Sequence, residues 1–253
     1  MSYQNSAEHP ALPQPEDSES LVWRYMDLPK LIALLGQRAL FFSRLDKLGD
    51  PYEGSITAPL KERLDLASHE TAERFAAFRK QYRMKTFVNC WRRGQNESEA
   101  MWRLYCGMQG VVIQTTYAKL KASIKQWNNP SIGIGLVTYR DYVADDIRSQ
   151  NFFIPLMSKR VAFNHENEVR IVWSMVGQNY PKENTVWENG VEGRPEPVGM
   201  LLPWNPDDFV ENIYISPYAD PWYGDVIKTT VEKFFPRLAA NISWSPMRSD
   251  PYY

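Results

Sequence analysis

Three ionisable residues at alternate positions form the most informative pattern in the sequence. They are Glu166, Glu168 and Arg170, in the stretch from Phe163 to Trp173 that reads FNHENEVRIVW. Because side chains alternate across a β-strand, the pattern predicts a strand with one buried apolar face and these three groups on the other, exposed face. Two carboxylates and a guanidinium are costly to hold together unless they pair or bind a ligand. The pattern therefore predicts either a chemical site or a simple Glu–Arg ladder on an exposed strand.

A loop at residues 48–54 is the second candidate region. Its Asp50 and Glu53 stand among turn-forming residues, and they can either ligate a hard divalent cation or cap a turn, with the structural interpretation favoured. Together with the two later glutamates they also suggest a Mg-dependent nuclease, which needs clustered carboxylates and a nearby cation. Such nucleases prefer a lysine two residues after the glutamate, where this chain has Arg170. The sequence therefore predicts no metal.

Other polar and aromatic residues have a structural and a functional interpretation. Trp102 and Tyr105 lie at helical spacing, which is typical of core packing, although such rings can also stack on nicotinamide or adenine. Lys159 and Arg160 are expected to be a solvated pair, with contact to a phosphate as the alternative. His165 is expected on the surface.

Order is expected to begin at Leu21, after a flexible, proline-rich tail at residues 1–20. Residues 21–253 are predicted to form a single α+β domain, with a mixed, mainly antiparallel sheet and flanking helices. Apolar alternation predicts strands at 21–26, 39–43, 86–91, 111–116, 135–139, 200–202, 212–216 and 242–245. Helical spacing and capping residues predict helices at 27–36, 59–83 (one helix or a pair), 98–107, 117–127 and 221–235.

Charge and composition exclude several classes of protein. Lysine plus arginine (29) nearly balances aspartate plus glutamate (30), so no global field draws the chain to nucleic acid or to an anionic membrane. There is no apolar run of the roughly 18 residues that a spanning helix needs, and no signal-peptide core. We expect a cytoplasmic protein without a membrane partner, whose Cys90 and Cys106 are free thiols.

Several short motifs, taken in order, resemble those of a widespread bacterial family of unknown function. The resemblance extends over residues 21–216. The motifs are WRY at 23–25, DPYEG at 50–54, NCW at 89–91, MWRLY at 101–105 with Gly110, VTY at 137–139 and ENEVR at 166–170.

A more remote resemblance concerns chemistry. An arginine on an early strand, a middle strand with a small polar residue and a late E-x-E are similar to the plan of ADP-ribosyltransferases, which implies NAD as substrate. Applied to this sequence, the plan implies that Arg24 binds the pyrophosphate of NAD and that Glu168 stabilises the positive charge that develops on the ribose. Glu166 would orient the acceptor, and Asn89 stands where those enzymes usually have serine or threonine. The cofactor contacts expected on this basis are Arg24, Tyr25, Asn89, Trp102, Tyr105 and Arg170.

The sequence leaves three functional hypotheses open. The first is an NAD-dependent ADP-ribosyltransferase-like or NAD glycohydrolase-like protein, which the resemblance associates with phage defence or a toxin system. The second is a non-catalytic binding or interaction module in which Arg24, Glu53, Glu168 and Arg170 form a buried ion-pair network. The Mg-dependent nuclease is the third. The ligand is expected to be NAD or another nucleotide, while the macromolecular acceptor and the oligomeric state are left open.

Overall fold

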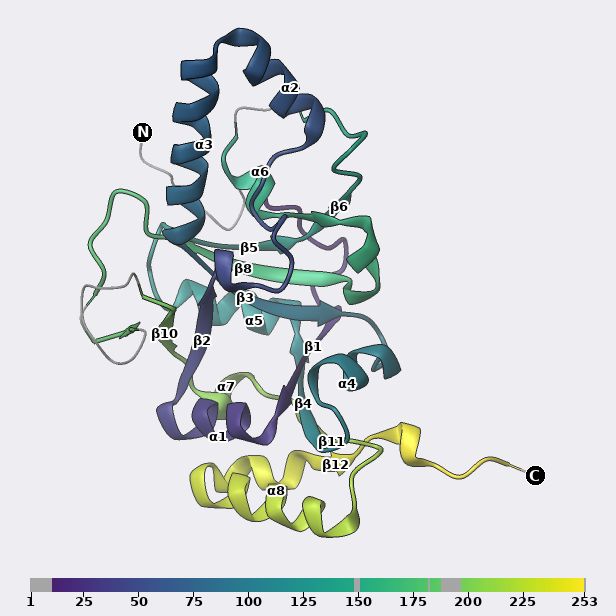
Figure 1. Cartoon of the computed structure of the whole chain (residues 1–253). Coiled ribbons are helices and arrows are strands. Elements are labelled where there is room, and N and C mark those ends of the chain that lie inside the picture. The colour runs from purple at the N-terminus through teal and green to yellow at the C-terminus, as the bar shows by residue number, and fades with distance from the viewer. Residues whose placement is uncertain (1–10, 148–150, 182, 188–196, 253) are drawn as a thin grey trace. The chain divides into compact units, whose positions relative to one another are not determined.

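The computed structural model describes residues 11–147, 151–181, 183–187 and 197–252. The chain separates into two compact units. Unit 1 comprises Met1–Glu16, Phe41–Cys90 and Asn128–Leu202, and unit 2 comprises Asp17–Leu40, Trp91–Trp127 and Pro203–Tyr253. Both units combine helices with strands that pair mostly antiparallel (Figure 1), which confirms the predicted α+β fold class.

Unit 1 is built on a sheet in which β8 pairs with β3 and β5, and the order continues from β3 through β2 and β10 to β9. A small parallel ladder of β6 and β7 completes its strands. The strands are β2 (Ala39–Arg44), β3 (Thr86–Arg93), β5 (Ile132–Leu136), β6 (Thr138–Arg140), β7 (Ser158–Arg160), β8 (Glu168–Ser174), β9 (Thr185–Val186) and β10 (Gly199–Pro203). The helices are η2 (Leu45–Lys47), α2 (Ala58–Ala67), α3 (His69–Met84), α6 (Phe153–Leu156) and η3 (Val161–Glu166). Three strands, β2, β3 and β10, continue from one unit into the other along the chain.

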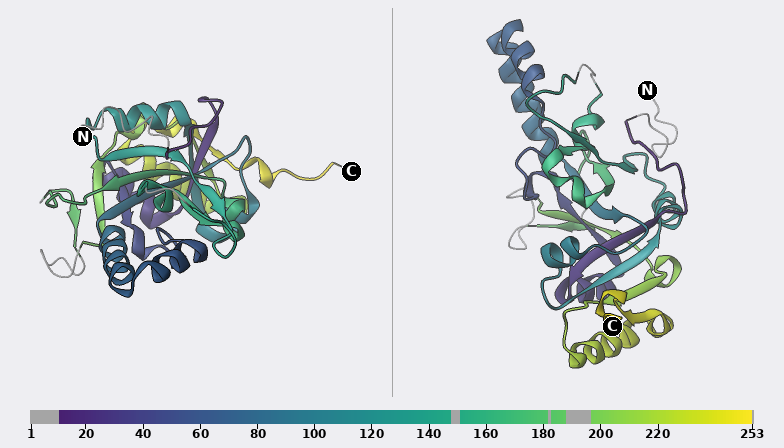
Figure 2. Two further views of the ribbon diagram at one scale, coloured as in Figure 1. Left: turned by 90° about the horizontal axis from the view of Figure 1, so that it is seen from above. Right: turned by 90° about the vertical axis from the view of Figure 1, so that its right-hand side faces the viewer.

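The predicted helical segment at 59–83 is a pair, α2 and α3. Ser68 separates the two helices with an extended backbone, and its side chain accepts a hydrogen bond from Thr71 N, which caps the start of α3. Most side chains of α2 are exposed, and the hairpin extends beyond the strands of unit 1 in Figure 1 and in the right-hand view of Figure 2.

The prediction of a flexible tail is wrong for residues 11–16, which pack on unit 1. Leu12 is buried in a core cluster with Val88, Leu156 and Val172, and Leu136 N donates to Pro13 O at 2.7 Å. An added Cβ at Gly135 would lie 2.9 Å from the Leu12 backbone, so only glycine leaves room for this segment. Residues 1–10 of the predicted tail lie outside the described part of the chain.

Unit 2 contains a four-strand ladder in the order β12–β11–β4–β1, and the end of β3 pairs with β1. Its strands are β1 (Leu21–Asp27), β4 (Gly110–Thr116), β11 (Asn212–Ile215) and β12 (Ile242–Trp244). Its helices are α1 (Leu28–Gln37), α4 (Glu99–Tyr105), α5 (Tyr117–Lys125), α7 (Pro206–Phe209), α8 (Pro221–Phe234), η5 (Pro236–Asn241) and η6 (Pro246–Arg248). Across the described ranges, no helix is both long and apolar enough to span a bilayer.

Local sequence signals account for α1. Asp27 is the N-cap and accepts a hydrogen bond from Lys30 N at 2.9 Å, while proline occupies the first turn. Leu31, Leu34 and Leu35 are all buried, as the apolar spacing predicts. This helix, its cap and its buried face are confirmed.

Candidate functional site

The region around the two glutamates differs from the predicted continuous strand. Residues Val161–Glu166 form the 3-10 helix η3, Asn167 has a left-handed backbone with φ 41°, and β8 begins only at Glu168. The three ionisable groups still come together, but the prediction of an exposed face is wrong. Glu166, Glu168 and Arg170 are 6%, 3% and 0% exposed. The opposite face is confirmed, because the apolar residues of β8 are buried as well.

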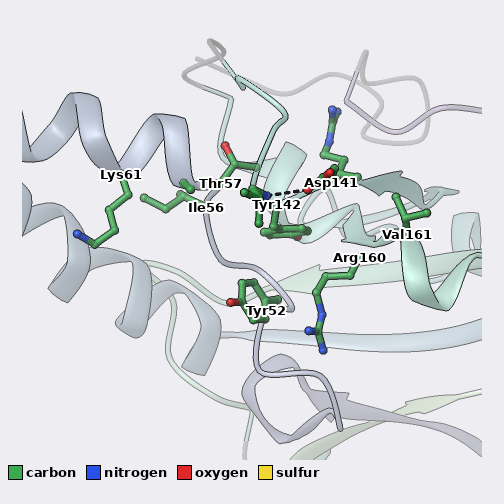
Figure 3. A pocket seen from close by; sticks show the side chains of 11 residues that line it. Tyr52, Ile56, Thr57, Lys61, Asp141, Tyr142, Arg160 and Val161 are labelled. Carbon is green, nitrogen blue, oxygen red and sulfur yellow. Dashed lines mark hydrogen bonds between the residues drawn. The ribbon is translucent and has the colours of Figure 1, made fainter.

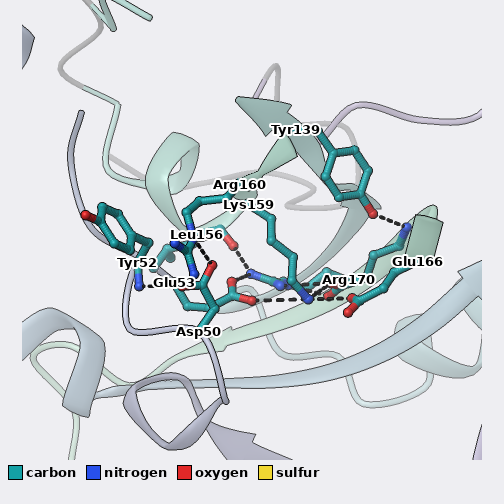
Figure 4. A network of polar contacts seen from close by, with 10 residues as sticks. Asp50, Tyr52, Glu53, Tyr139, Leu156, Lys159, Arg160, Glu166 and Arg170 are labelled. Carbon is teal, nitrogen blue, oxygen red and sulfur yellow. Dashed lines mark hydrogen bonds and ion pairs between the residues drawn. The ribbon is translucent and has the colours of Figure 1, made fainter. Parts of the chain in front are cut away.

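These groups belong to a buried ion-pair network of five residues, Glu53, Lys159, Glu166, Glu168 and Arg170 (Figure 4). Arg170 binds Glu168 with two donors, at 2.7 Å and 3.0 Å. Its Nη1 donates to Glu53 at 2.8 Å and to Leu156 O at 2.8 Å. This arrangement holds the guanidinium by several of its donors at once.

Lys159 provides the second cation of the network. Its ammonium contacts Glu166, lies 3.2 Å from a Glu168 oxygen and lies 3.3 Å from a Glu53 oxygen. The side chain is 9% exposed, so the expectation of a solvated Lys159 is wrong. Three carboxylates explain its burial, because a buried ammonium needs opposite charge and hydrogen-bond acceptors.

The network fixes the ionisation of its members. Burial by itself would raise the pKa of Glu168, but the charges of Arg170 and Lys159 lower that pKa to about 2. Burial would lower the pKa of Lys159, whereas the surrounding carboxylates, with Glu168 first, raise it. Glu168 is therefore ionised and Lys159 protonated at neutral pH.

An open cavity of about 500 Å³ lies in the same unit (Figure 3). Its walls come from the loop after residue 50, the start of α2, the segment after β6 and the end of β7. The lining includes Tyr52, Thr57, Lys61, Tyr142 and Arg160. The rings of Tyr52 and Tyr142 meet edge to face with centroids 5.3 Å apart, and the Arg160 guanidinium lies 4.6 Å from the Tyr52 ring centroid.

The cavity and the network share the same short segments. In the loop, Tyr52 lines the cavity and the next residue, Glu53, enters the network. In β7, Lys159 enters the network and the next residue, Arg160, lines the cavity. Arg160 is further fixed by Asp50, whose two oxygens accept from Nε at 3.0 Å and pair with Nη2 at 2.8 Å. The network therefore determines where two walls of the cavity lie.

Two hydroxyl groups in the cavity lining are buried without a hydrogen-bond partner among the described residues. They are Thr57 Oγ1 and the Tyr142 hydroxyl. Thr57 is the N-cap residue of α2, yet its side chain makes no capping hydrogen bond. Burial raises the pKa of Tyr142 to about 12, assisted by the negative charge of Glu53, so its hydroxyl keeps its proton. Buried polar groups normally have partners, and a bound ligand can supply both.

Asn89 and Cys90 lie on β3 in unit 1. Asn89 is 1% exposed, and its side-chain amide donates to Phe41 O at 2.8 Å. Burial raises the pKa of the Cys90 thiol, and the nearby charge of Glu168 adds to the increase. Both cysteines are free, as predicted.

The other residues that the resemblance selects belong to unit 2. The Arg24 guanidinium lies 5.8 Å from the Trp91 ring centroid. Tyr25 packs edge to face on Trp102 at 5.3 Å, and its hydroxyl accepts a hydrogen bond from a backbone amide. Trp102 is fully buried, as core packing predicts, whereas Tyr105 is 43% exposed, so the expectation of burial is wrong for Tyr105. Its position at the end of α4 explains the difference.

Sequence reasoning missed the two unpartnered hydroxyls and the role of Lys159. Thr57 carried one available signal, because it directly precedes a helix that starts with alanine and proline. No local pattern distinguishes Tyr142. In the part of the chain that the structure describes, no group of three or more potential metal-ligating side chains could hold an ion.

Comparison with known proteins gives one match, to a family model that covers part of the chain. No curated protein and no solved structure gives a significant match. The segment 101–171, which includes the MWRLY and ENEVR motifs, matches the model of a family described as "Protein of unknown function (DUF2971)".

Proposed function

We propose that the chain binds a nucleotide in the cavity of unit 1, with NAD as the ligand that the sequence resemblance favours. The observation that carries this proposal is the pair of buried hydroxyls, Thr57 Oγ1 and the Tyr142 hydroxyl, without partners in the described structure. A sugar or base can form hydrogen bonds with both hydroxyls. Without such bonds, their burial is unfavourable in free energy. The volume of about 500 Å³ lies within the usual range for small-molecule sites.

The chemistry of the lining fits a phosphorylated aromatic ligand. Tyr52 is 43% exposed and offers a ring on which a base or nicotinamide can stack. Arg160 lies beside that ring and is held in place by Asp50. Arg140 and Lys61, which pairs with Asp65, place two further cations in the wall, against one carboxylate of the described lining, Asp141. Guanidinium groups suit phosphate oxygens because they present several donors in one plane.

In this proposal the ion-pair network positions the binding site and is not itself reactive. Glu168 has both carboxylate oxygens engaged by Arg170 and is 3% exposed. This observation supports the binding-module hypothesis over direct contact between Glu168 and a substrate. Removing one partner of a buried pair leaves a charge uncompensated, which costs about 3–5 kcal/mol.

A calorimetric titration tests the proposal. NAD, ADP-ribose and nicotinamide mononucleotide are titrated into the purified full chain, and we expect at least one Kd in the micromolar range. Lys61→Met should weaken binding roughly fivefold through loss of one phosphate contact. Lys125→Met, an equal charge change on α5 of unit 2, is the matched control and should change nothing. Absence of binding by all three nucleotides would overturn the proposal.

NAD turnover is the second candidate function, and one observation favours it. Glu168 remains ionised, with a pKa of about 2, as required of a carboxylate that stabilises positive charge on a ribose. The measurement is release of nicotinamide, together with label transfer from NAD to protein, DNA and RNA. A catalytic Glu168 predicts that Glu168→Gln abolishes turnover with an unchanged melting temperature. The positioning role predicts a lower melting temperature instead.

A further inference from the structure

A second cavity of about 450 Å³ lies against the α2–α3 hairpin of unit 1. Its lining is largely apolar and comes from both helices and from the segment before α6. The residues that matter here are Leu60, Leu64, Phe75, Phe152, Arg63 and Arg79. Such a cavity suits the hydrocarbon part of a small molecule, because burial of apolar surface drives binding.

Arg79, on α3, is a buried cation in this lining. It is 6% exposed, and one Nη group donates to Gly54 O. Its Nε is buried without an acceptor in the described structure. The guanidinium also lies 5.4 Å from the Tyr82 ring centroid. Burial lowers the pKa of Arg79 to about 10, so the group is still charged at neutral pH.

The other cations of unit 1 that are buried or line this cavity have carboxylate partners. Arg170 and Lys159 share the glutamates of the network, and Arg63 pairs with Asp146. Among the described residues, no carboxylate pairs with Arg79. A buried cation without an anion is strongly unfavourable. An anionic ligand that enters the cavity would remove this cost.

We propose that this cavity binds an aliphatic monocarboxylate, with its carboxylate on Arg79 and its hydrocarbon chain along Leu60, Leu64 and Phe75. One unpaired guanidinium balances one negative charge and can bind a carboxylate through two donors. The apolar walls disfavour a polyphosphate, which would bring more charge than Arg79 can balance. This cavity adjoins the proposed nucleotide site, with which it shares the lining residue Ile56, but its ligand differs in chemistry.

Calorimetry with octanoate and 1-octanol tests the proposal on the unaltered full chain. The two probes have the same hydrocarbon length, so their difference in affinity reports the charged head group alone. We expect octanoate to bind at least tenfold more tightly than 1-octanol. Equal affinities, or no binding of octanoate, would overturn the proposal.

Two variants test whether the carboxylate of bound octanoate contacts Arg79. Arg79→Gln should abolish the preference for octanoate over octanol, and Arg79→Lys should retain part of it, with thermal melts showing that each variant is folded. If Arg79→Gln does not fold, the carboxyl resonance of 13C-labelled octanoate provides the test in the wild type. The pKa of the octanoate carboxyl group, followed through this resonance, should fall on binding if a cation contacts the group. An unchanged pKa contradicts the assignment.

The carboxylate could belong to a free aliphatic acid or to the C-terminus of an apolar peptide. A further titration uses N-acetyl-trileucine with a free carboxylate and the same peptide as its amide. Tighter binding of octanoate than of either peptide supports an aliphatic acid. Tighter binding of the free peptide than of octanoate overturns this assignment in favour of a peptide C-terminus.

Discussion

Glu168 and Thr57 are both buried polar residues of unit 1, but their surroundings satisfy them differently. Glu168 accepts from two Arg170 donors, whereas Thr57 Oγ1 has no partner in the described structure. A satisfied group stabilises the fold, while an unsatisfied one costs free energy until a ligand arrives. Loss of the Glu168 carboxylate should therefore reduce the stability of the fold, and loss of the Thr57 hydroxyl should reduce the affinity for the ligand.

Thr57→Val tests the role of the unpartnered hydroxyl. The change keeps the side-chain shape, so we expect an unfolding free energy equal to or higher than that of the wild type and an NAD affinity about fivefold lower. Thr86→Val is the control, because Thr86 Oγ1 donates to Tyr82 O at 2.8 Å. It should lose about 1 kcal/mol of stability in urea unfolding. An unchanged NAD affinity of Thr57→Val would contradict the ligand assignment.

Glu168→Gln tests the network. We expect a loss of about 3–5 kcal/mol in the free energy of unfolding, because Arg170 and Lys159 keep buried charge without its main partner. Glu62→Gln, on the exposed surface of α2, should have little effect. A Glu168→Gln variant as stable as the wild type would contradict a structural network.

The same residue predicts a pH dependence. The pKa of Glu168 is about 2 in the folded chain, below its ordinary value of 4.5. Its contribution to stability is therefore complete above pH 4.5 and is lost as the pH falls from 4.5 towards 2. Urea unfolding across this range should show a steeper loss in the wild type than in Glu168→Gln. Parallel curves would contradict the ionised, paired state.

At the scale of elements, the loop after residue 50 connects the network to the cavity. The loop ends at Gly54, whose φ of 73° and close packing exclude a side chain: an added Cβ would lie 2.6 Å from Leu45. Gly54→Ala should cost about 1–3 kcal/mol and also weaken NAD binding, because Tyr52 and Glu53 are displaced. Gly49→Ala meets nothing within 4 Å and should change neither property. Equal effects of the two variants would contradict this role of the loop.

The elements also show which features the sequence could predict. The helix α1 was predictable because its cap and apolar stripe lie within one short segment. The stretch from Phe163 was not, because the left-handed backbone at Asn167 joins a 3-10 helix to a strand without disrupting the alternation of residue types. Burial of β8 on both faces was also hidden, since Glu168 and Arg170 pair with each other and also need Lys159 and Glu53, which lie outside the strand.

At the scale of the whole molecule, the site depends on contacts between distant segments. The alternative of a buried network grouped Arg24, Glu53, Glu168 and Arg170, and it is confirmed for the last three. Glu53 and Arg170 are 117 positions apart, and nothing local indicates that Lys159 joins them. The cavity is similarly assembled from the α2 region and the segment after β6. Residue types predicted the polar chemistry, whereas three-dimensional packing determined which groups are buried and which line a cavity.

Net charge gives a prediction at this scale. The chain carries a formal charge of −1, so local cations and not a global field attract an anionic ligand. Raising NaCl from about 0.05 M to about 0.5 M should weaken NAD binding less than tenfold, because few exposed contacts are screened. A much steeper salt dependence in calorimetry would indicate the extended phosphate recognition of a nucleic-acid-binding protein.

The most direct test of the proposed cavity is the Kd of NAD for the wild type and for Tyr142→Phe, measured side by side by calorimetry. The variant removes one buried, unpartnered hydroxyl and leaves the ring and the ion-pair network in place. We predict that the wild type binds NAD and that the variant binds it about tenfold more weakly at an unchanged melting temperature. Equal affinities, or no binding to the wild type, would contradict the account.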